Sequence, residues 1–90
     1  MEGKVRLRNM VNIFGDAYCV LSGPELKVYS NGDDAKARKS PNETEEIERV
    51  DDWDGKGTIN TYENGFLFVT KSAKKIQVLA PSAEEKESWM

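Results

Sequence analysis

The chain has 90 residues, of which 38% are hydrophobic and 32% are charged. It therefore has room for one domain with a modest core. Its 13 basic and 16 acidic side chains give a net charge of −3, which argues against a nucleic-acid-binding protein, because such proteins usually present a basic face. The sequence contains no histidine, which excludes Ser-His and Cys-His nucleophile pairs and Cys/His zinc sites. We expect a single binding domain over residues 1–90, without enzymatic activity and without a cofactor.

The sequence favours a cytoplasmic protein. No apolar run approaches the roughly 20 residues that a membrane-spanning helix needs, and the first residues lack the apolar stretch of a secretory signal. Cys19 is the only cysteine and cannot form an internal disulfide, which fits a reducing compartment. This location is compatible with peripheral association with a membrane.

The first thirty residues predict three strands. Residues 4–8 and 26–30 alternate between polar and apolar side chains, as half-buried strands do, and residues 17–21 are rich in β-branched and aromatic side chains. The connection at 9–15 is unusually apolar. Its residues 10–14 either insert into a lipid headgroup region or extend the neighbouring strands onto the core, and we favour the second interpretation.

The middle of the chain is less regular. Asn31-Gly32-Asp33-Asp34 is a turn signal, and the residues from there to Asn42 are small, polar and basic and contain Pro41, which predicts a solvated loop. Residues 43–50 fit either of two structures. Ile47 and Val50 are three positions apart, which is a helical spacing, whereas Arg49-Val50-Asp51 fits an edge strand. Residues 58–62 have the composition of a strand.

The last third gives the clearest pattern. Residues 66–70 and 76–80 predict two strands, with a hairpin turn signal at Glu63-Asn64-Gly65. The sequence Ser82-Ala83-Glu84-Glu85 matches a capping box and predicts a helix over 82–90. Because nine residues do not form a stable helix alone, Trp89 is expected to dock this helix onto the core.

Taken together, these elements resemble the pleckstrin homology (PH) family, especially the versions found beside Rho exchange-factor and FYVE modules. Residues 64–70, 76–80 and 82–90 resemble the last two strands and the closing helix of that family, and residues 18–21 and 26–29 resemble its second and third strands. The resemblance implies a mainly β fold, a seven-stranded bent antiparallel barrel or sandwich that is capped by a C-terminal α-helix, with Trp89 plugging one open end. The helix of this family usually continues past the tryptophan, so we expect the domain to be truncated at its C-terminal helix. The resemblance also implies an adaptor domain that is part of a larger multidomain signalling protein.

The resemblance also implies weak electrostatic attachment to anionic membranes or phosphoinositides. Phosphoinositide-binding members carry basic residues near the end of the first strand and along the second. Here Arg8 occupies the position near the end of the first strand, but Asp16 and Ala17 occupy the positions in the second strand where basic residues are expected. Binding should therefore be weak and sensitive to salt. In the resembled fold the loops after strands one, three and six open at one end of the barrel, where basic side chains add to one positive field. The candidate lipid-binding residues are Arg6, Arg8, Lys27, Lys36, Arg38, Lys39, Lys71, Lys74 and Lys75.

An alternative function is protein binding without a lipid. Residues 43–54 hold seven acidic side chains and one arginine, and such a segment can attract a basic partner, although it is more often only a solvated surface. The candidate partner-binding residues are Trp53, Glu45, Glu46 and Glu48.

A second alternative is a calcium-binding loop at 52–63. Asp52, Asp54, Asn60 and Glu63 lie at ligand positions of an EF-hand loop, and Gly57 lies at its bend. However, Lys56 lies at a position that needs a ligand oxygen, and the residues that should form the exit helix predict a strand. We therefore favour no metal site and expect an acidic hairpin here.

Overall fold

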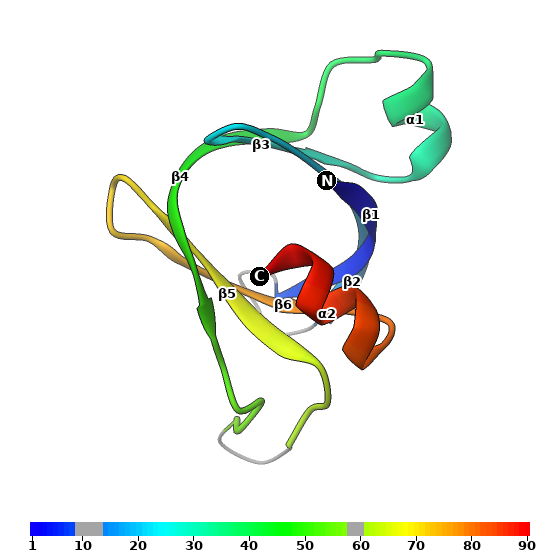
Figure 1. Ribbon diagram of the computed structural model, residues 1–90. Helices are drawn as coiled ribbons and strands as arrows, with labels where there is room; N and C mark the ends of the chain where they lie inside the picture. The colour runs from blue at the N-terminus through cyan, green and yellow to red at the C-terminus, as the bar shows by residue number, and fades with distance from the viewer. Residues whose placement is uncertain (9–13, 58–60) are drawn as a thin grey trace.

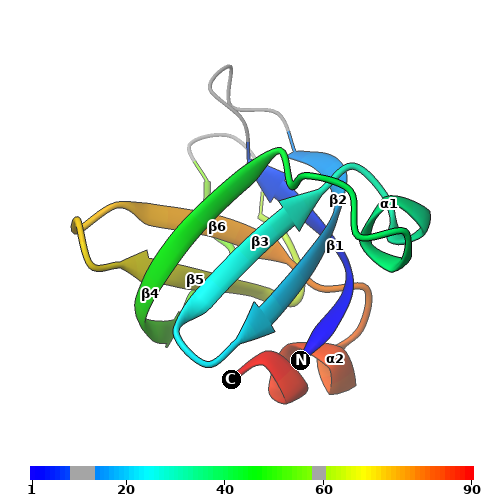
Figure 2. The same ribbon diagram turned by 90° about the horizontal axis from the view of Figure 1, so that it is seen from above.

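The computed structural model describes residues 1–8, 14–57 and 61–90. These residues form six strands and two short helices, in the order β1 (Glu2–Arg8), β2 (Phe14–Ser22), β3 (Glu25–Tyr29), α1 (Gly32–Lys36), β4 (Glu43–Asp52), β5 (Gly65–Thr70), β6 (Lys75–Leu79) and α2 (Ala83–Trp89). All neighbouring strands are antiparallel, and they form a closed barrel. Figure 1 shows this ring of strands, and Figure 2 shows α2 beneath it and α1 at its side.

The barrel closes where β1 meets β6, with Arg6 opposite Leu79 and Leu7 opposite Val78. Strand β4 pairs with two neighbours in turn. Its residues 43–46 pair with β3 and its residues 47–52 pair with β5, and a β-bulge lies between Ile47 and Arg49. Such a bulge bends a strand, and this bend lets one strand continue from one part of the barrel wall to the next.

The structure decides between the two alternatives for residues 43–50, but it describes only the end of the strand expected at 58–62. Residues 43–50 are a strand, and this strand extends to Asp52. Of the strand expected at 58–62, residues 58–60 lie outside the described residues, and Thr61 forms an isolated antiparallel bridge with Lys56. The described part of the chain therefore holds six strands, where the sequence predicted seven.

The turn and loop predicted from residue 31 onward were wrong over residues 32–36, which form α1, whereas residues 37–42 form the irregular segment that the sequence predicted. The side chain of Asn31 caps the helix and accepts a hydrogen bond from the backbone N–H of Asp34 at 2.8 Å. Asp33 and Asp34 lie in the first turn, where negative charge is favourable. The helix packs against β2 and β3.

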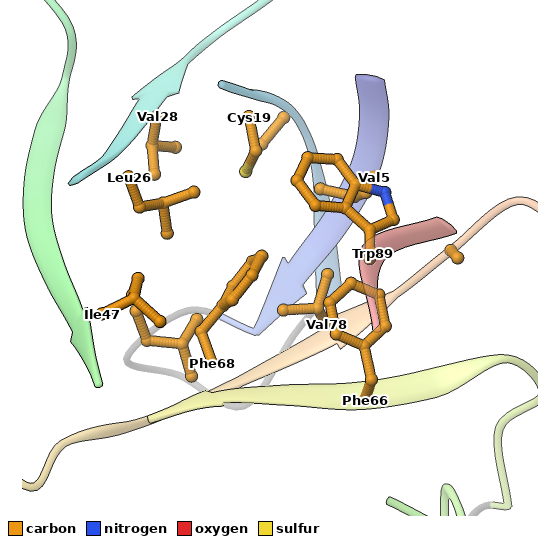
Figure 3. Close-up of a cluster of buried hydrophobic side chains, with 12 residues drawn as sticks. Val5, Cys19, Leu26, Val28, Ile47, Phe66, Phe68, Val78 and Trp89 are labelled. Atoms are coloured by element: carbon orange, nitrogen blue, oxygen red, sulfur yellow. The ribbon is translucent and has the colours of Figure 1, made fainter. Parts of the chain in front are cut away.

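The core contains side chains from every strand and from α2. Figure 3 shows the indole of Trp89 close to Phe66, Val78 and Val5. The Trp89 ring stacks on Phe66 with 6.2 Å between ring centroids and meets Phe68 edge-on at 5.7 Å. With 3% of Trp89 exposed, the prediction that this residue docks the closing helix is confirmed.

The start of α2 also agrees with the sequence. The hydroxyl of Ser82 accepts a hydrogen bond from the backbone N–H of Glu85 at 3.2 Å, as an N-cap does. In the part of the chain that the structure describes, neither helix has the length and apolar character needed to cross a bilayer.

The apolar connection after β1 is only partly described. Residues 9–13 lie outside the described residues, so the prediction for most of this segment is not tested. Phe14 belongs to β2, is buried, and packs on Tyr62 with 4.7 Å between ring centroids.

Candidate functional site

A cavity of about 440 Å³ lies where the ends of several strands come together. It has an apolar wall and a polar rim. The rim includes three of the nine predicted lipid-binding cations, Arg8, Lys74 and Lys75, together with one carboxylate, Glu43. The remaining lining residues are Leu7, Val28, Trp53, Leu67, Ile76 and Gln77.

Arg8 reaches this cavity from the last position of β1. Its neighbour Leu7 is in register with Val78 of β6, and this register places Arg8 beside Gln77. The guanidinium Nη1 of Arg8 donates a hydrogen bond to Gln77 Oε1. Its Nε is buried and has no hydrogen-bond partner among the described residues. Gln77 therefore orients the Arg8 guanidinium at the edge of the cavity.

Lys74 lies in the turn between β5 and β6, and its backbone is held in place by Thr70. The backbone N–H of Lys74 donates to Thr70 Oγ1 at 3.1 Å, and the Lys74 carbonyl accepts from the Thr70 N–H at 2.9 Å. The Lys74 ammonium forms ion pairs with Glu43 at 2.8 Å and with Glu45 at 3.4 Å. The hydrogen bond between Lys74 and Glu43 lowers the pKa of the Glu43 carboxyl and raises the pKa of Lys74.

Lys75 opens β6 and is exposed. Within the described ranges, neither Lys75 nor Arg8 has a carboxylate oxygen within 4 Å. Among the described residues, the rim of the cavity thus combines two cations that have no counter-ion with one lysine that is already paired. This arrangement can bind a small anion such as a phosphate group.

The other six predicted cations do not reach this cavity. Lys27, Lys39 and Lys71 form ion pairs with Glu25, Asp34 and Glu46. Arg6 is exposed on β1 opposite Asp16. Lys36 and Arg38 are exposed on α1 and just after it. In both Figure 1 and Figure 2, α1 and the β5–β6 turn lie on opposite sides of the barrel, so the basic side chains do not form one patch.

The predicted partner-binding residues also have partners within the chain. Trp53 is half-buried and packs on Phe14 and Tyr62, with ring centroids 6.3 and 6.4 Å away. Glu45 and Glu46 pair with Lys74 and Lys71, and Glu48 lies 3.5 Å from the Arg49 guanidinium. These ion pairs reduce the negative charge that the acidic strand presents to a basic partner.

The predicted calcium ligands that the structure describes have other contacts. Asp52 forms an ion pair with Lys86 of α2 at 2.6 Å, and this contact lowers the Asp52 pKa. Asp54 accepts a hydrogen bond from the backbone N–H of Lys56. Asn60 lies outside the described residues, and Glu63 is exposed. The loop is followed by strand β5 rather than by the exit helix of an EF-hand. No group of three acidic or cysteine side chains within the described ranges is placed to hold a metal ion.

Two residues of the cavity rim were missed in the sequence. Gln77 follows Lys75 by two positions, so strand alternation places it on the same face of β6, and this signal was available. Glu43 was read only as part of the acidic segment. Its position depends on how the start of β4 lies relative to the β5–β6 turn, which the local sequence does not indicate.

Comparison with solved structures identifies the fold. The chain superposes on the tandem PX-PH domains of Bem3 from Saccharomyces cerevisiae with a TM-score of 0.74 and 18% identity, over 98% of this chain and 38% of that one. For the C-terminal PH domain of human pleckstrin, the TM-score is 0.77 and the identity is 16%, over 99% of this chain and 71% of that one. For the PH domain of Slm1 in complex with phosphoserine, the TM-score is 0.75 and the identity is 16%, over 99% of this chain and 86% of that one.

No protein-family model and no curated protein matches the sequence. The structural similarity spans nearly the whole chain, and each of these three structures contains a PH domain. The chain therefore has the pleckstrin homology fold, as its last two strands and its closing helix predicted.

Proposed function

We propose that this chain is a non-catalytic adaptor domain of a larger signalling protein, and that it attaches weakly to anionic membranes by binding a phosphoinositide headgroup at the cavity. The observation that carries the proposal is the position of Arg8, Lys74 and Lys75 around one cavity of about 440 Å³. The pleckstrin homology fold also supports the proposed binding of a phosphate-bearing ligand. The Slm1 domain, which shares this fold, has been solved in complex with phosphoserine, a molecule that carries a phosphate monoester.

The charges around the cavity account for weak attachment. Each lysine or arginine near an anionic leaflet contributes about 1 kcal/mol. Glu43 shares the cavity with the three cations and holds Lys74, and the chain as a whole carries a net charge of −3. Binding that depends on so few charges should be lost when salt screens them.

Vesicle sedimentation tests the proposal. We expect the protein to bind phosphatidylcholine vesicles that contain phosphoinositide at about 0.1 M salt and to be released at about 0.3 M salt. The double variant Arg8→Gln/Lys75→Gln removes the two cations that have no carboxylate partner in the described part of the chain. It should weaken binding by about ten- to thirtyfold, since each contributes about 1 kcal/mol.

The matched control is Lys27→Gln/Lys39→Gln. It removes the same net charge from two lysines that are paired elsewhere on the surface, and it should weaken binding less than about twofold. An equal loss in both double variants would show that diffuse charge, rather than the cavity, attracts the membrane. Absence of binding to every anionic vesicle would favour the other interpretation, a protein-binding module that uses Trp53 and the acidic strand.

A further inference from the structure

The ammonium of Lys74 is held by two carboxylates of one strand. Side chains alternate between the two faces of a strand, so Glu43 and Glu45 lie on one face of β4 and Glu46 lies on the other. The face of Glu43 and Glu45 continues to the buried Ile47. This face brings both carboxylates to the β5–β6 turn, at 2.8 and 3.4 Å from Lys74 Nζ. The turn itself is fixed by the hydrogen bonds between Thr70 and Lys74, so Lys74 can leave the carboxylates only by turning its side chain.

The two other cations at the cavity differ from Lys74. Arg8 is oriented by Gln77, and within the described ranges neither Arg8 nor Lys75 has a carboxylate within 4 Å. An anion that enters the cavity can therefore contact Arg8 and Lys75 at once. To contact Lys74, it must compete with two carboxylates, one of which also lines the cavity.

We infer that Glu43 and Glu45 withhold Lys74 from the ligand, so that the site presents two available cations and accepts one phosphate group of a headgroup. This inference rests on the proposed function and adds the residues that set its affinity and specificity. A second phosphate group gains little, because the position that would receive it offers a neutralised lysine and a carboxylate of like charge.

A double-mutant cycle tests the inference directly. The probes are phosphatidylcholine vesicles that contain either phosphatidylinositol monophosphate or phosphatidylinositol trisphosphate. The wild-type chain should bind both with similar affinity, within about threefold. Glu43→Gln/Glu45→Gln should strengthen binding to the trisphosphate vesicles by roughly fivefold, the effect of one additional cation near an anionic surface, and should strengthen monophosphate binding less.

The effect of Lys74 should depend on the background. In the wild-type chain, Lys74→Gln should change binding less than about twofold, because this ammonium is already paired. In the Glu43→Gln/Glu45→Gln background, the same substitution should remove the whole gain. A loss that is equal in the two backgrounds would overturn the inference.

A second double variant controls for net charge. Glu46→Gln/Glu48→Gln also removes two charges from β4, but its carboxylates pair with Lys71 and Arg49 and do not line the cavity. It should leave the ratio between the two lipids unchanged. If both glutamate pairs act alike, the inference fails and the proposed function stands. If no protein in the series binds either vesicle, the proposed function fails. Near-UV circular dichroism confirms that each variant is folded.

Discussion

At the scale of single residues, Cys19 shows how burial determines chemistry. Its side chain on β2 is fully buried in the core cluster. Burial, together with the charge of Glu43, raises the pKa of the thiol to about 12. The thiol therefore stays protonated at neutral pH and packs as a small hydrophobic group.

This burial predicts a loss of stability in alkali. In the unfolded chain the thiol ionises near pH 8.5, whereas in the folded chain it ionises only near pH 12. Between these values the unfolded state loses a proton that the folded state keeps, so the free energy of unfolding falls as pH rises, and below about pH 8.5 Cys19 has no such effect. At pH 10 the expected loss is about 2 kcal/mol.

Denaturant unfolding at pH 7 and pH 10 measures this effect. The Cys19→Ala variant controls for every other group that titrates in the same range, Tyr18 included. The wild-type protein should lose more stability than Cys19→Ala between the two pH values. Parallel losses in the two proteins would show that the thiol is not shielded from water in the folded state.

At the scale of elements, Gly65 has a different role from the one its sequence suggested. In the expected hairpin signal, the glycine would supply a left-handed backbone conformation. Instead, Asn64 takes that conformation with φ of 58°, and Gly65 is the first residue of β5. The Trp53 ring lies directly over Gly65, so a Cβ built there would be 2.6 Å from Trp53 Cε3. The missing side chain makes room for the aromatic cluster of Phe14, Trp53 and Tyr62.

Gly65→Ala should therefore displace Trp53. We expect a loss of about 1–3 kcal/mol, the usual cost of overpacking, together with a change in the near-UV circular dichroism of the aromatic cluster. Gly15→Ala on β2 is the control, because no atom of the described residues lies within 4 Å of the added Cβ there. If the two variants were equally stable in denaturant, close packing of Trp53 would not be the reason for glycine at position 65.

The closing helix was predictable because its signals are local. Ser82, the acidic first turn and Trp89 lie within eight residues of each other, and each has the predicted role. Helix α1 has the same kind of cap at Asn31, but its five residues bury no side chain and so leave no apolar pattern to detect. Short helices of this kind are found in a sequence only through their caps.

The cavity was predictable only in part. The family resemblance pointed to Arg8, Lys74 and Lys75, but it also pointed to six cations that the fold places elsewhere. Position in the barrel decides which cations reach the cavity, ion pairs decide which cations are neutralised, and these pairs join distant residues. Lys71 and Glu46 are 25 positions apart, and Lys74 and Glu43 are 31 positions apart. No local pattern indicates which lysine meets which glutamate, because that depends on how β4 bends past the β5–β6 turn.

At the scale of the whole molecule, β5 separates two apolar clusters. Phe66 and Phe68 point into the barrel and contact Trp89. On the other face of the strand, Trp53 covers Gly65 and packs with Phe14 and Tyr62. Each cluster contains one tryptophan, and the chain has only these two. Because the same hydrogen-bonded strands support both clusters, we expect them to unfold together, as in a single domain over residues 1–90.

Single-tryptophan variants test this cooperativity. Trp89→Phe leaves Trp53 as the fluorescent reporter of the outer cluster, and Trp53→Phe leaves Trp89 as the reporter of the core. The two variants will differ in stability, so the comparison is made within each protein. The denaturant midpoint from tryptophan fluorescence should coincide with the midpoint from far-UV circular dichroism, as two-state unfolding requires. In Trp89→Phe, a fluorescence transition at lower denaturant than the far-UV transition would mean that the outer cluster detaches while the barrel persists. The aromatic cluster would then be a separate, weaker layer rather than part of the cooperative fold.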